Sequence, residues 1–198
     1  KQVHDFWNDA SCGEALYLNS NDKGGYEAQS VNRYVLEPYI LEFADFKSAS
    51  EKKILEVGVG LGADHQRFAE SGAILYGVDL TDRAIKHTGD RLNAFGLKSQ
   101  LSTGDAENLD FPDNFFDQVY SWGVLHHSPN TPKTINEVYR VLKHGGVASI
   151  MIYHKWSIVG FMLWVRYALL MGKPWLSLQN IYSNHLESPG TKAYSVSE

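Results

Sequence analysis

The fold of this chain is decided by the stretch Glu56-Val57-Gly58-Val59-Gly60-Leu61-Gly62, in which three glycines alternate with apolar residues. Residues 53–57 are typical of a short buried strand, and residues 63–70 are typical of a helix that ends at Gly72. Glycine suits the turn between them because it adopts backbone angles that a Cβ forbids and lets a ligand lie against main-chain N–H groups. The stretch therefore predicts a nucleotide-cofactor loop.

The spacing of the glycines does not by itself identify the cofactor. Gly58, Gly60 and Ala63 also satisfy the dinucleotide fingerprint of dehydrogenases. A second apolar strand, residues 73–78, ends at Asp79, which places a carboxylate where a ribose diol would lie. Both cofactor classes use such a carboxylate, so Asp79 does not separate them.

Two later segments do separate the cofactor classes. Gly104-Asp105-Ala106-Glu107 ends a third strand, and residues 116–123 form a fourth strand that is followed by His126 and His127. In this order and spacing the chain resembles the class I S-adenosylmethionine-dependent methyltransferases, particularly the branch similar to ubiquinone and menaquinone biosynthesis methyltransferases. The resemblance spans residues 52–154 and implies S-adenosylmethionine as the cofactor.

The resemblance also implies a set of cofactor contacts. It assigns the methionine part to Glu56 and the glycine loop, the ribose hydroxyls to Asp79, and the adenine to residues after the second and third strands. Main-chain contacts near the sulfonium come from the end of the fourth strand. The implied cofactor residues are Glu56, Gly58, Gly60, Gly62, Asp79, Leu80, Asp105, Ala106, Ser121, Trp122 and Gly123.

The first fifty residues alternate between aromatic and polar side chains, which predicts a helical cap. In similar enzymes such a leader folds over the cofactor cleft. Tyr26, Arg33 and Tyr34 are therefore candidates for contact with the ligand, although an aromatic stripe at helical spacing is also typical of an ordinary core.

The remaining periodicity predicts an α/β fold with a doubly wound, mostly parallel sheet. Residues 82–95 are expected to form a helix with Asp82 as its N-cap, and residues 131–142 a helix with Pro132 in its first turn. Residues 147–153 follow as a fifth strand. The ligand should lie at the carboxyl ends of the strands, as in a Rossmann-like methyltransferase fold.

We divide the chain into three regions of one domain: the cap at 1–50, an S-adenosylmethionine-binding core at 51–155, and an apolar helix with a lid loop at 156–198. Relatives usually finish with an antiparallel strand pair at the sheet edge, and no convincing sequence for it follows residue 173. Residues 195–198 have the spacing of a capping box that opens a helix. Both observations suggest a fragment of a longer protein.

Composition narrows the class of partner. The chain has 198 residues, a net charge of −5 and no long basic block, so a nucleic-acid acceptor is not expected. The single cysteine, Cys12, suits a reducing cytoplasm. Oligomeric state is not indicated.

The apolar run at 156–171 is shorter than the roughly 20 residues that a membrane span needs. Three interpretations remain open for it: a core helix against the sheet, which is favoured, an interfacial helix, or a wall of an apolar acceptor pocket. Stable membrane insertion is therefore not expected, and peripheral contact stays open.

His126 and His127 stand beside the expected position of the methyl group. Either histidine is a candidate base for an acceptor that loses a proton, and the alternative is that both orient the acceptor and the loop. No third ligand stands near them in the sequence, so no metal is expected. The polar segment 184–194, with turn residues at 188–190, is the candidate lid over the acceptor.

The sequence therefore predicts a methyltransferase that uses S-adenosylmethionine to methylate a small, apolar or aromatic metabolite by in-line transfer. Two alternatives stay open. One is a nicotinamide-dependent oxidoreductase, and the other is a non-catalytic protein that binds S-adenosylmethionine.

Overall fold

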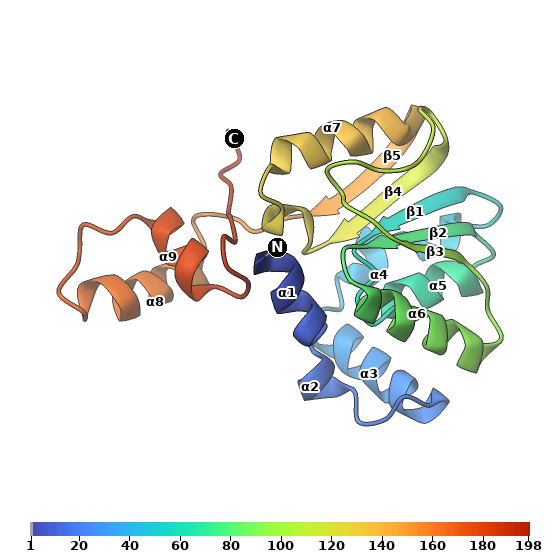
Figure 1. Ribbon diagram of the computed structural model, residues 1–198, viewed down its shortest axis with the longest axis horizontal. Coiled ribbons are helices and arrows are strands. Elements are labelled where there is room, and N and C mark those ends of the chain that lie inside the picture. Colours follow the sequence, from blue (N-terminus) through green and yellow to red (C-terminus); the bar gives the residue numbers. More distant parts are fainter. Residues whose placement is uncertain (1) are drawn as a thin grey trace.

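The computed structural model describes residues 2–198, and its centre is a parallel sheet (Figure 1). The strands lie in the order β3-β2-β1-β4-β5, and all of their pairings are parallel. Their bounds are β1 Lys53–Val57, β2 Ile74–Asp79, β3 Gln100–Thr103, β4 Phe116–Trp122 and β5 Leu142–Met151. Because β1 lies between β2 and β4, the chain runs outward in both directions from β1, and the predicted doubly wound sheet is confirmed.

The helices that follow the strands are α5 (Ala63–Glu70), α6 (Asp82–Phe95) and α7 (Thr131–Val141). The prediction that Asp82 caps α6 is wrong. The hydroxyl of Thr81 is the cap and accepts a hydrogen bond from the Ala84 N–H at 3.3 Å. Asp82 instead accepts a hydrogen bond from the Thr103 hydroxyl at 2.6 Å, which joins the start of α6 to the end of β3.

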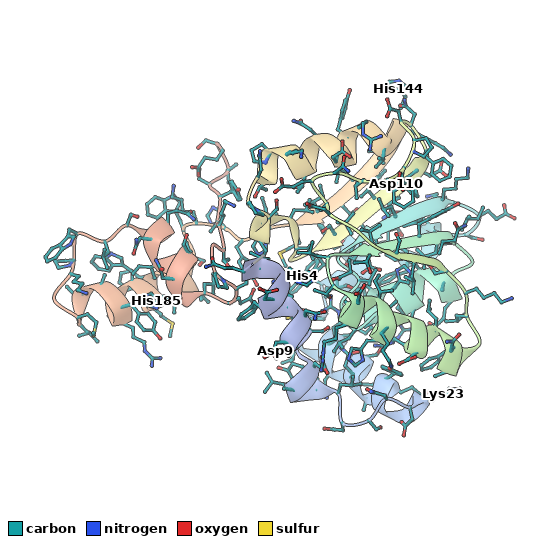
Figure 2. All side chains as sticks on the ribbon, viewed as in Figure 1. His4, Asp9, Lys23, Asp110, His144 and His185 are labelled. Carbon is teal, nitrogen blue, oxygen red and sulfur yellow. The ribbon has the colours of Figure 1, made fainter. Side chains whose placement is uncertain are left out.

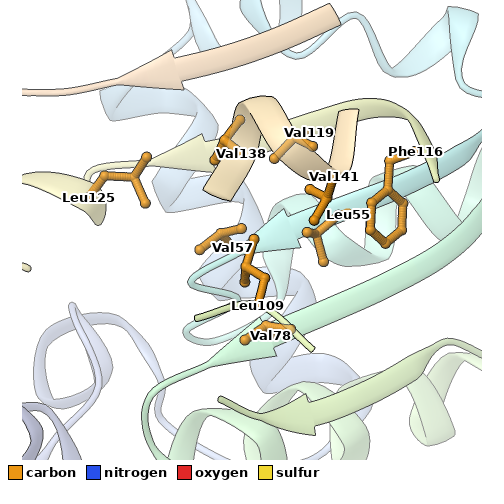
Figure 3. Packing of buried hydrophobic residues seen from close by; sticks show 9 residues of the cluster. All are labelled: Leu55, Val57, Val78, Leu109, Phe116, Val119, Leu125, Val138 and Val141. Carbon is orange, nitrogen blue, oxygen red and sulfur yellow. The ribbon is translucent and has the colours of Figure 1, made fainter. Parts of the chain in front are cut away.

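Alternate side chains along the strands point to opposite faces of the sheet and pack into two separate hydrophobic cores, one on each face. Leu55 and Val57 of β1 pack with Val138 and Val141 of α7, as Figure 3 shows. Ile54 points to the opposite face, where helices α4 (Ile40–Phe43) and α5 cover the sheet. The sheet is therefore buried on both faces, as parallel sheets require.

The predicted helical cap is present at the N-terminal end of the described residues. Its elements are α1 Gln2–Asp9, α2 Glu14–Tyr17, α3 Lys23–Leu36, α4 Ile40–Phe43 and the 3₁₀ turn η1 Phe46–Ser48. Figure 1 shows α1 beside the carboxyl ends of the strands, with α3 below α6.

Arg91 of α6 fastens the cap to the core. Its side chain has no exposed surface, and burial lowers its pKa to about 10. Its guanidinium donates hydrogen bonds to Gln29 Oε1 at 2.7 Å and to the Tyr26 carbonyl at 2.8 Å, both on α3. It also donates to the Leu61 carbonyl at 2.9 Å and to Gln66 Oε1 at 2.7 Å. One buried side chain thus ties α3, α5 and the glycine loop together.

Residues 156–171 do not form the core helix that was favoured. Helix α8 (Ile158–Trp164), the π-helical segment η3 (Val165–Leu169) and α9 (Leu178–His185) form an arm that projects away from the sheet in Figure 1. Trp156 and Ile158 are 68% and 81% exposed. The apolar residues of α8 lie outside the cavity described below, so the pocket-wall interpretation is not supported either. The interfacial interpretation stays a prediction.

The arm holds itself together through contacts between α8 and α9. Gly160 allows the Tyr182 hydroxyl to approach α8 closely, because a Cβ at this position would lie only 1.7 Å from that oxygen. Within residues 2–198 no helix is long and apolar enough to cross a membrane. Past β5 the only pairing in the described chain is an isolated parallel bridge between His154 and Tyr194, and an antiparallel edge pair does not occur there.

Candidate functional site

A cavity of about 1060 Å³ lies at the carboxyl ends of β1, β2 and β4, where the strand order reverses. Its size is at the upper end of the roughly 300–1,000 Å³ range of small-molecule sites. Helix α1 closes one side, and Figure 2 shows His4 of α1 between the sheet and the arm. The predicted position of the ligand, at the ends of the strands, therefore coincides with the large cavity.

The glycine loop forms the floor of this cavity. Gly58 has φ 86°, and a Cβ there would lie 2.2 Å from Cγ2 of Val124. Gly60 has φ 52°, and a Cβ there would meet nothing within 4 Å. Gly62, with φ 75°, begins α5 as its N-cap. Gly58 therefore serves close packing, whereas Gly60 leaves main chain open to a ligand.

Asp79 fixes the loop to the end of β2. Its Oδ2 accepts a hydrogen bond from the Gly60 N–H at 3.2 Å, and its Oδ1 accepts from the N–H and the hydroxyl of Thr81 at 3.0 and 2.9 Å. Burial raises the pKa of this carboxyl despite these bonds. Asp79 lines the cavity, so contact with a ribose stays a prediction that the geometry permits.

Glu56 also lines the cavity and forms a buried pair with His65 of α5. Its Oε2 lies 2.8 Å from His65 Nδ1, and His65 Nε2 lies 2.8 Å from the Ser99 hydroxyl. That hydroxyl donates to the Leu75 carbonyl, so its oxygen accepts the Nε2 proton and Nδ1 is left as an acceptor. Burial raises the pKa of Glu56 and lowers that of His65 to about 3, which favours a neutral pair with the proton on Glu56.

Asp64, which the sequence analysis did not single out, is a further carboxylate in the cavity wall. It accepts hydrogen bonds from Arg33 Nε and Nη2 at 3.1 and 2.6 Å and from the hydroxyls of Tyr34 and Tyr120 at 3.0 and 2.8 Å. Its position in the first turn of α5 was the available signal, because a helix N-terminus stabilises an anion.

Two of the three cap candidates lie outside the cavity lining. Arg33 lines the cavity, whereas Tyr34 stands behind it and holds Asp64, and Tyr26 is fully buried with its ring beneath Arg91. Direct contact of Tyr26 or Tyr34 with a ligand in the cavity is therefore not supported.

Most of the residues expected around the adenine and the sulfonium line the cavity. Those that line the cavity are Leu80, Asp105, Ala106, Trp122 and Gly123. Ser121 is the exception, because it is fully buried and its hydroxyl donates to the Val57 carbonyl at 2.9 Å. Of its two neighbours in β4, Trp122 lines the cavity, whereas Tyr120 is fully buried outside the lining.

The two histidines differ in their access to the cavity. His127 lines it, whereas His126 lies outside the lining and packs on the ring of Tyr153 at 4.0 Å. His127 Nδ1 lies 2.8 Å from the Ser188 hydroxyl and 3.1 Å from the Thr191 hydroxyl. The predicted lid segment therefore reaches the histidines, although its motion stays a prediction.

Folding also brings Glu187 to the histidines. Its Oε2 lies 3.3 Å from His127 Nε2, and its Oε1 accepts a hydrogen bond from the Tyr153 hydroxyl at 2.8 Å. The burial of Glu187 opposes ionisation, but the bonds with His127 and Tyr153 outweigh it and lower the pKa of Glu187. Glu187 is thus a third potential metal ligand beside His126 and His127, contrary to the expectation from their sequence spacing.

Residues 55–150 match the family model described as a methyltransferase domain. This segment is therefore similar to methyltransferase domains. The chain is 32% identical to a sterol 24-C-methyltransferase of Eremothecium gossypii over 151 residues, which cover 75% of this chain and 39% of the relative. It is 34% identical to phosphoethanolamine N-methyltransferase 2 of Caenorhabditis elegans over 118 residues, which cover 59% and 26%. The chain thus spans well under half the length of these curated relatives.

Solved structures share the fold of more than half of this chain. The YcgJ protein of Bacillus subtilis is 28% identical with a TM-score of 0.52, and the match covers 56% of this chain and 50% of that one. The [4+2]-cyclase SpnF is 27% identical with a TM-score of 0.52, and the match covers 62% and 44%. These likenesses support the class that the sequence resembles, and the ubiquinone and menaquinone branch stays a prediction.

The cofactor of the class that the chain resembles is S-adenosylmethionine, and the cavity fits it. A ligand with cationic sulfonium and ammonium groups is complementary to a wall rich in carboxyl groups. Those that line the cavity are Glu37, Glu56, Asp64, Asp79, Asp105, Glu107 and Glu187. Gly60 supplies the open main chain beside them. The pyrophosphate of a nicotinamide dinucleotide would instead place negative charge against Glu56 and Asp64.

Proposed function

We propose that this protein transfers the methyl group of S-adenosylmethionine to a small, apolar or aromatic acceptor. The observation that carries the proposal is the acidic cavity over the glycine loop, at the switch point of the sheet. The chain covers only part of the length of its relatives, and the sterol and phosphoethanolamine in the names of those relatives are not assigned to this chain. The acceptor is therefore argued from the cavity alone.

Bound S-adenosylmethionine supplies a methyl group that its sulfonium charge already activates. The protein's task is then to orient the two reactants and to exclude water. We assign Glu56 to the cofactor's ammonium group and Asp79 to its ribose. The neutral form of Glu56 would give up its proton when a cation arrives, because an adjacent positive charge favours the carboxylate.

We place the acceptor between the end of β4 and the lid. Aromatic side chains surround this part of the cavity, with Trp7 of α1 in edge contact with His127 at 5.3 Å and with Tyr153 and Trp122 on the far wall. Rings of this kind favour a flat or apolar molecule. His127 and Glu187 are the polar groups available to an acceptor hydroxyl or amine, and His126 is not, because it lies outside the lining.

SpnF, a neighbour named as a cyclase, shows that this fold carries other reactions. A protein that binds S-adenosylmethionine without transferring its methyl group is therefore the second candidate. The two candidates make the same prediction for cofactor binding and opposite predictions for turnover.

The test begins with calorimetric titration of the purified chain with S-adenosylhomocysteine, with NAD as the control ligand. Binding of S-adenosylhomocysteine alone supports the proposal, and binding of NAD alone would overturn it. Asp79→Asn should weaken binding, whereas Asp110→Asn, an exposed carboxylate in Figure 2, should not. Incubation with S-adenosylmethionine and a panel of phenols, quinols and amines then follows, with mass spectrometry of the products. Cofactor binding without any methylated product would favour the second candidate.

A further inference from the structure

We propose that His126, His127 and Glu187 together bind one divalent transition-metal ion at the acceptor end of the cavity. One possible ligand atom from each of these residues lies within 4.8 Å of the other two. The ion's role beside an acceptor would rest on the proposed function, but its binding does not. The chemistry expected is that of zinc, which two imidazoles and a carboxylate hold with a coordination position left open.

The first support is a set of buried nitrogen atoms that have no partner. His126 has no exposed surface, and neither of its ring nitrogens has a hydrogen-bond partner among the described residues. His127 is 6% exposed, and its Nε2 has no hydrogen-bond partner of good geometry in the same part of the chain. Buried polar atoms are rarely left unpaired in native proteins, so unpaired nitrogens on two adjacent rings indicate a missing ligand, which an ion would supply to one nitrogen of each ring.

The second support is that hydrogen bonds orient two of the three side chains, those of His127 and Glu187. The Thr191 hydroxyl donates to the Ser188 carbonyl at 2.6 Å, so its oxygen is free to accept from His127 Nδ1–H. The Ser188 hydroxyl, 2.8 Å from Nδ1, can accept in the same way, and with the proton on Nδ1 the lone pair of Nε2 faces Glu187. The Tyr153 hydroxyl holds Oε1 of Glu187 and leaves Oε2 toward His127. Partners of this kind commonly orient metal-binding histidines and carboxylates.

The third support is distance. Two ligand atoms on one tetrahedral ion, each bonded at roughly 2.0–2.2 Å, lie about 3.4 Å apart. His127 Nε2 and Glu187 Oε2 are 3.3 Å apart. A lone pair and a carboxylate oxygen repel each other at this separation unless a cation or a proton lies between them. One nitrogen of His126 lies within 4.8 Å of a ligand atom of each of the other two residues, and a small side-chain movement brings it to a bonding distance.

The backbone conformation of Glu187 and the charges around the cluster agree with a metal site. Glu187 has φ 52°, a left-handed conformation that a glutamate adopts only when its surroundings hold it there. Lys192, a cation nearby, is turned away from the cluster because its Nζ donates to the carbonyls of Ser128 and Pro129. Access is available because His127 and Glu187 both line the cavity.

The test uses the untagged full chain, stripped of metal by a chelator and titrated with Co²⁺. One Co²⁺ per chain, with the visible absorption of a tetrahedral nitrogen and oxygen site that Zn²⁺ then abolishes, is the expected result. Glu187→Gln, which keeps the size of the side chain, should weaken Co²⁺ binding at least tenfold. His126→Asn should do the same, and His144→Gln, at the opposite end of the sheet in Figure 2, should bind as the wild type does.

Two outcomes would overturn the proposal. One is a folded chain, by circular dichroism, that takes up no Co²⁺, which would mean that a proton on His127 bridges it to Glu187. The other is Co²⁺ binding that Glu187→Gln leaves unchanged, which would place the ion elsewhere. Titration with S-adenosylhomocysteine runs in parallel, so that a failure of the proposed function is seen separately from a failure to bind metal.

Discussion

Alanine at Gly58 and alanine at Gly60 are expected to damage different properties of this protein. A Cβ at Gly58 would lie 2.2 and 2.7 Å from the two γ-carbons of Val124, inside a packed part of the loop. A Cβ at Gly60 would meet no protein atom within 4 Å and would enter the space assigned to the cofactor. Gly58→Ala should therefore reduce stability, and Gly60→Ala should mainly reduce affinity.

The magnitudes follow from backbone angle and packing. Both glycines have positive φ, and an L-residue in that region costs about 1–2 kcal/mol. Overpacking adds about 1–3 kcal/mol at Gly58 alone. Alanine returns about 0.4–1 kcal/mol at both positions by restricting the unfolded chain. We therefore expect a loss of about 3 kcal/mol for Gly58→Ala and of about 1 kcal/mol for Gly60→Ala.

Urea unfolding followed by circular dichroism measures the two losses, and titration with S-adenosylhomocysteine measures affinity. Gly60→Ala should weaken binding more than tenfold, or about 1.4 kcal/mol. Val124→Ala removes both γ-carbons and should restore part of the stability of Gly58→Ala, although Cβ of Val124 would remain 2.9 Å from the new methyl group. Equal losses of stability for the two glycine variants, or no recovery in the Gly58→Ala/Val124→Ala double variant, would refute the packing argument.

Three further outcomes are expected. Arg91→Met leaves four buried acceptors without a donor, so urea unfolding should show a loss of about 3–5 kcal/mol, and a loss below 1 kcal/mol would contradict the network. The pKa of His65, lowered from 6.5 to about 3, makes stability rise with pH between 3 and 6.5, and the raised pKa of Glu56 makes a contribution of opposite sign that begins at its unfolded value of 4.5. Glu56→Gln, which mimics the protonated carboxyl, should remove this opposing contribution, so urea unfolding should show a steeper rise in stability between pH 4.5 and 6.5, and an unchanged profile would assign the opposing contribution to another group. Asp79→Ala should weaken S-adenosylhomocysteine binding in calorimetry while leaving the fold intact, and equal affinity would remove Asp79 from the site.

The predictable part of this fold is the part with local signals. The bounds of β1, α5 and α6 follow from short apolar runs that end at glycines, and the structure reproduces them. The cap of α6 was assigned to Asp82 instead of Thr81 because both residues are good caps and stand next to each other. The position of Asp79 could be predicted in the same way. Asp79 stands at the carboxyl end of the strand that follows the glycine loop, so it must lie at the same edge of the sheet as that loop.

The unpredicted part depends on contacts between distant segments. Glu187 reaches His127 from far along the chain, and Asp64 meets Arg33 of the cap, so neither pairing has a spacing that sequence reasoning could use. The favoured interpretation of the apolar run at 156–171, a core helix against the sheet, was wrong for a related reason. Hydrophobicity shows that a segment favours burial, but it does not show which surface covers it, and in this structure much of its apolar surface is exposed.

The buried guanidinium of Arg91 has a consequence for how the molecule opens. If α3 lifted away alone, the charge would lose its acceptors on Gln29 and Tyr26 while it stayed packed against the Leu61 carbonyl. That half-open state is costly, so the cap and the loop should open as one cooperative unit. Amide protons of residues 23–36 and 61–70 would then exchange with solvent at a common free energy, and a ligand held by the loop would slow exchange along the whole of α3 as well.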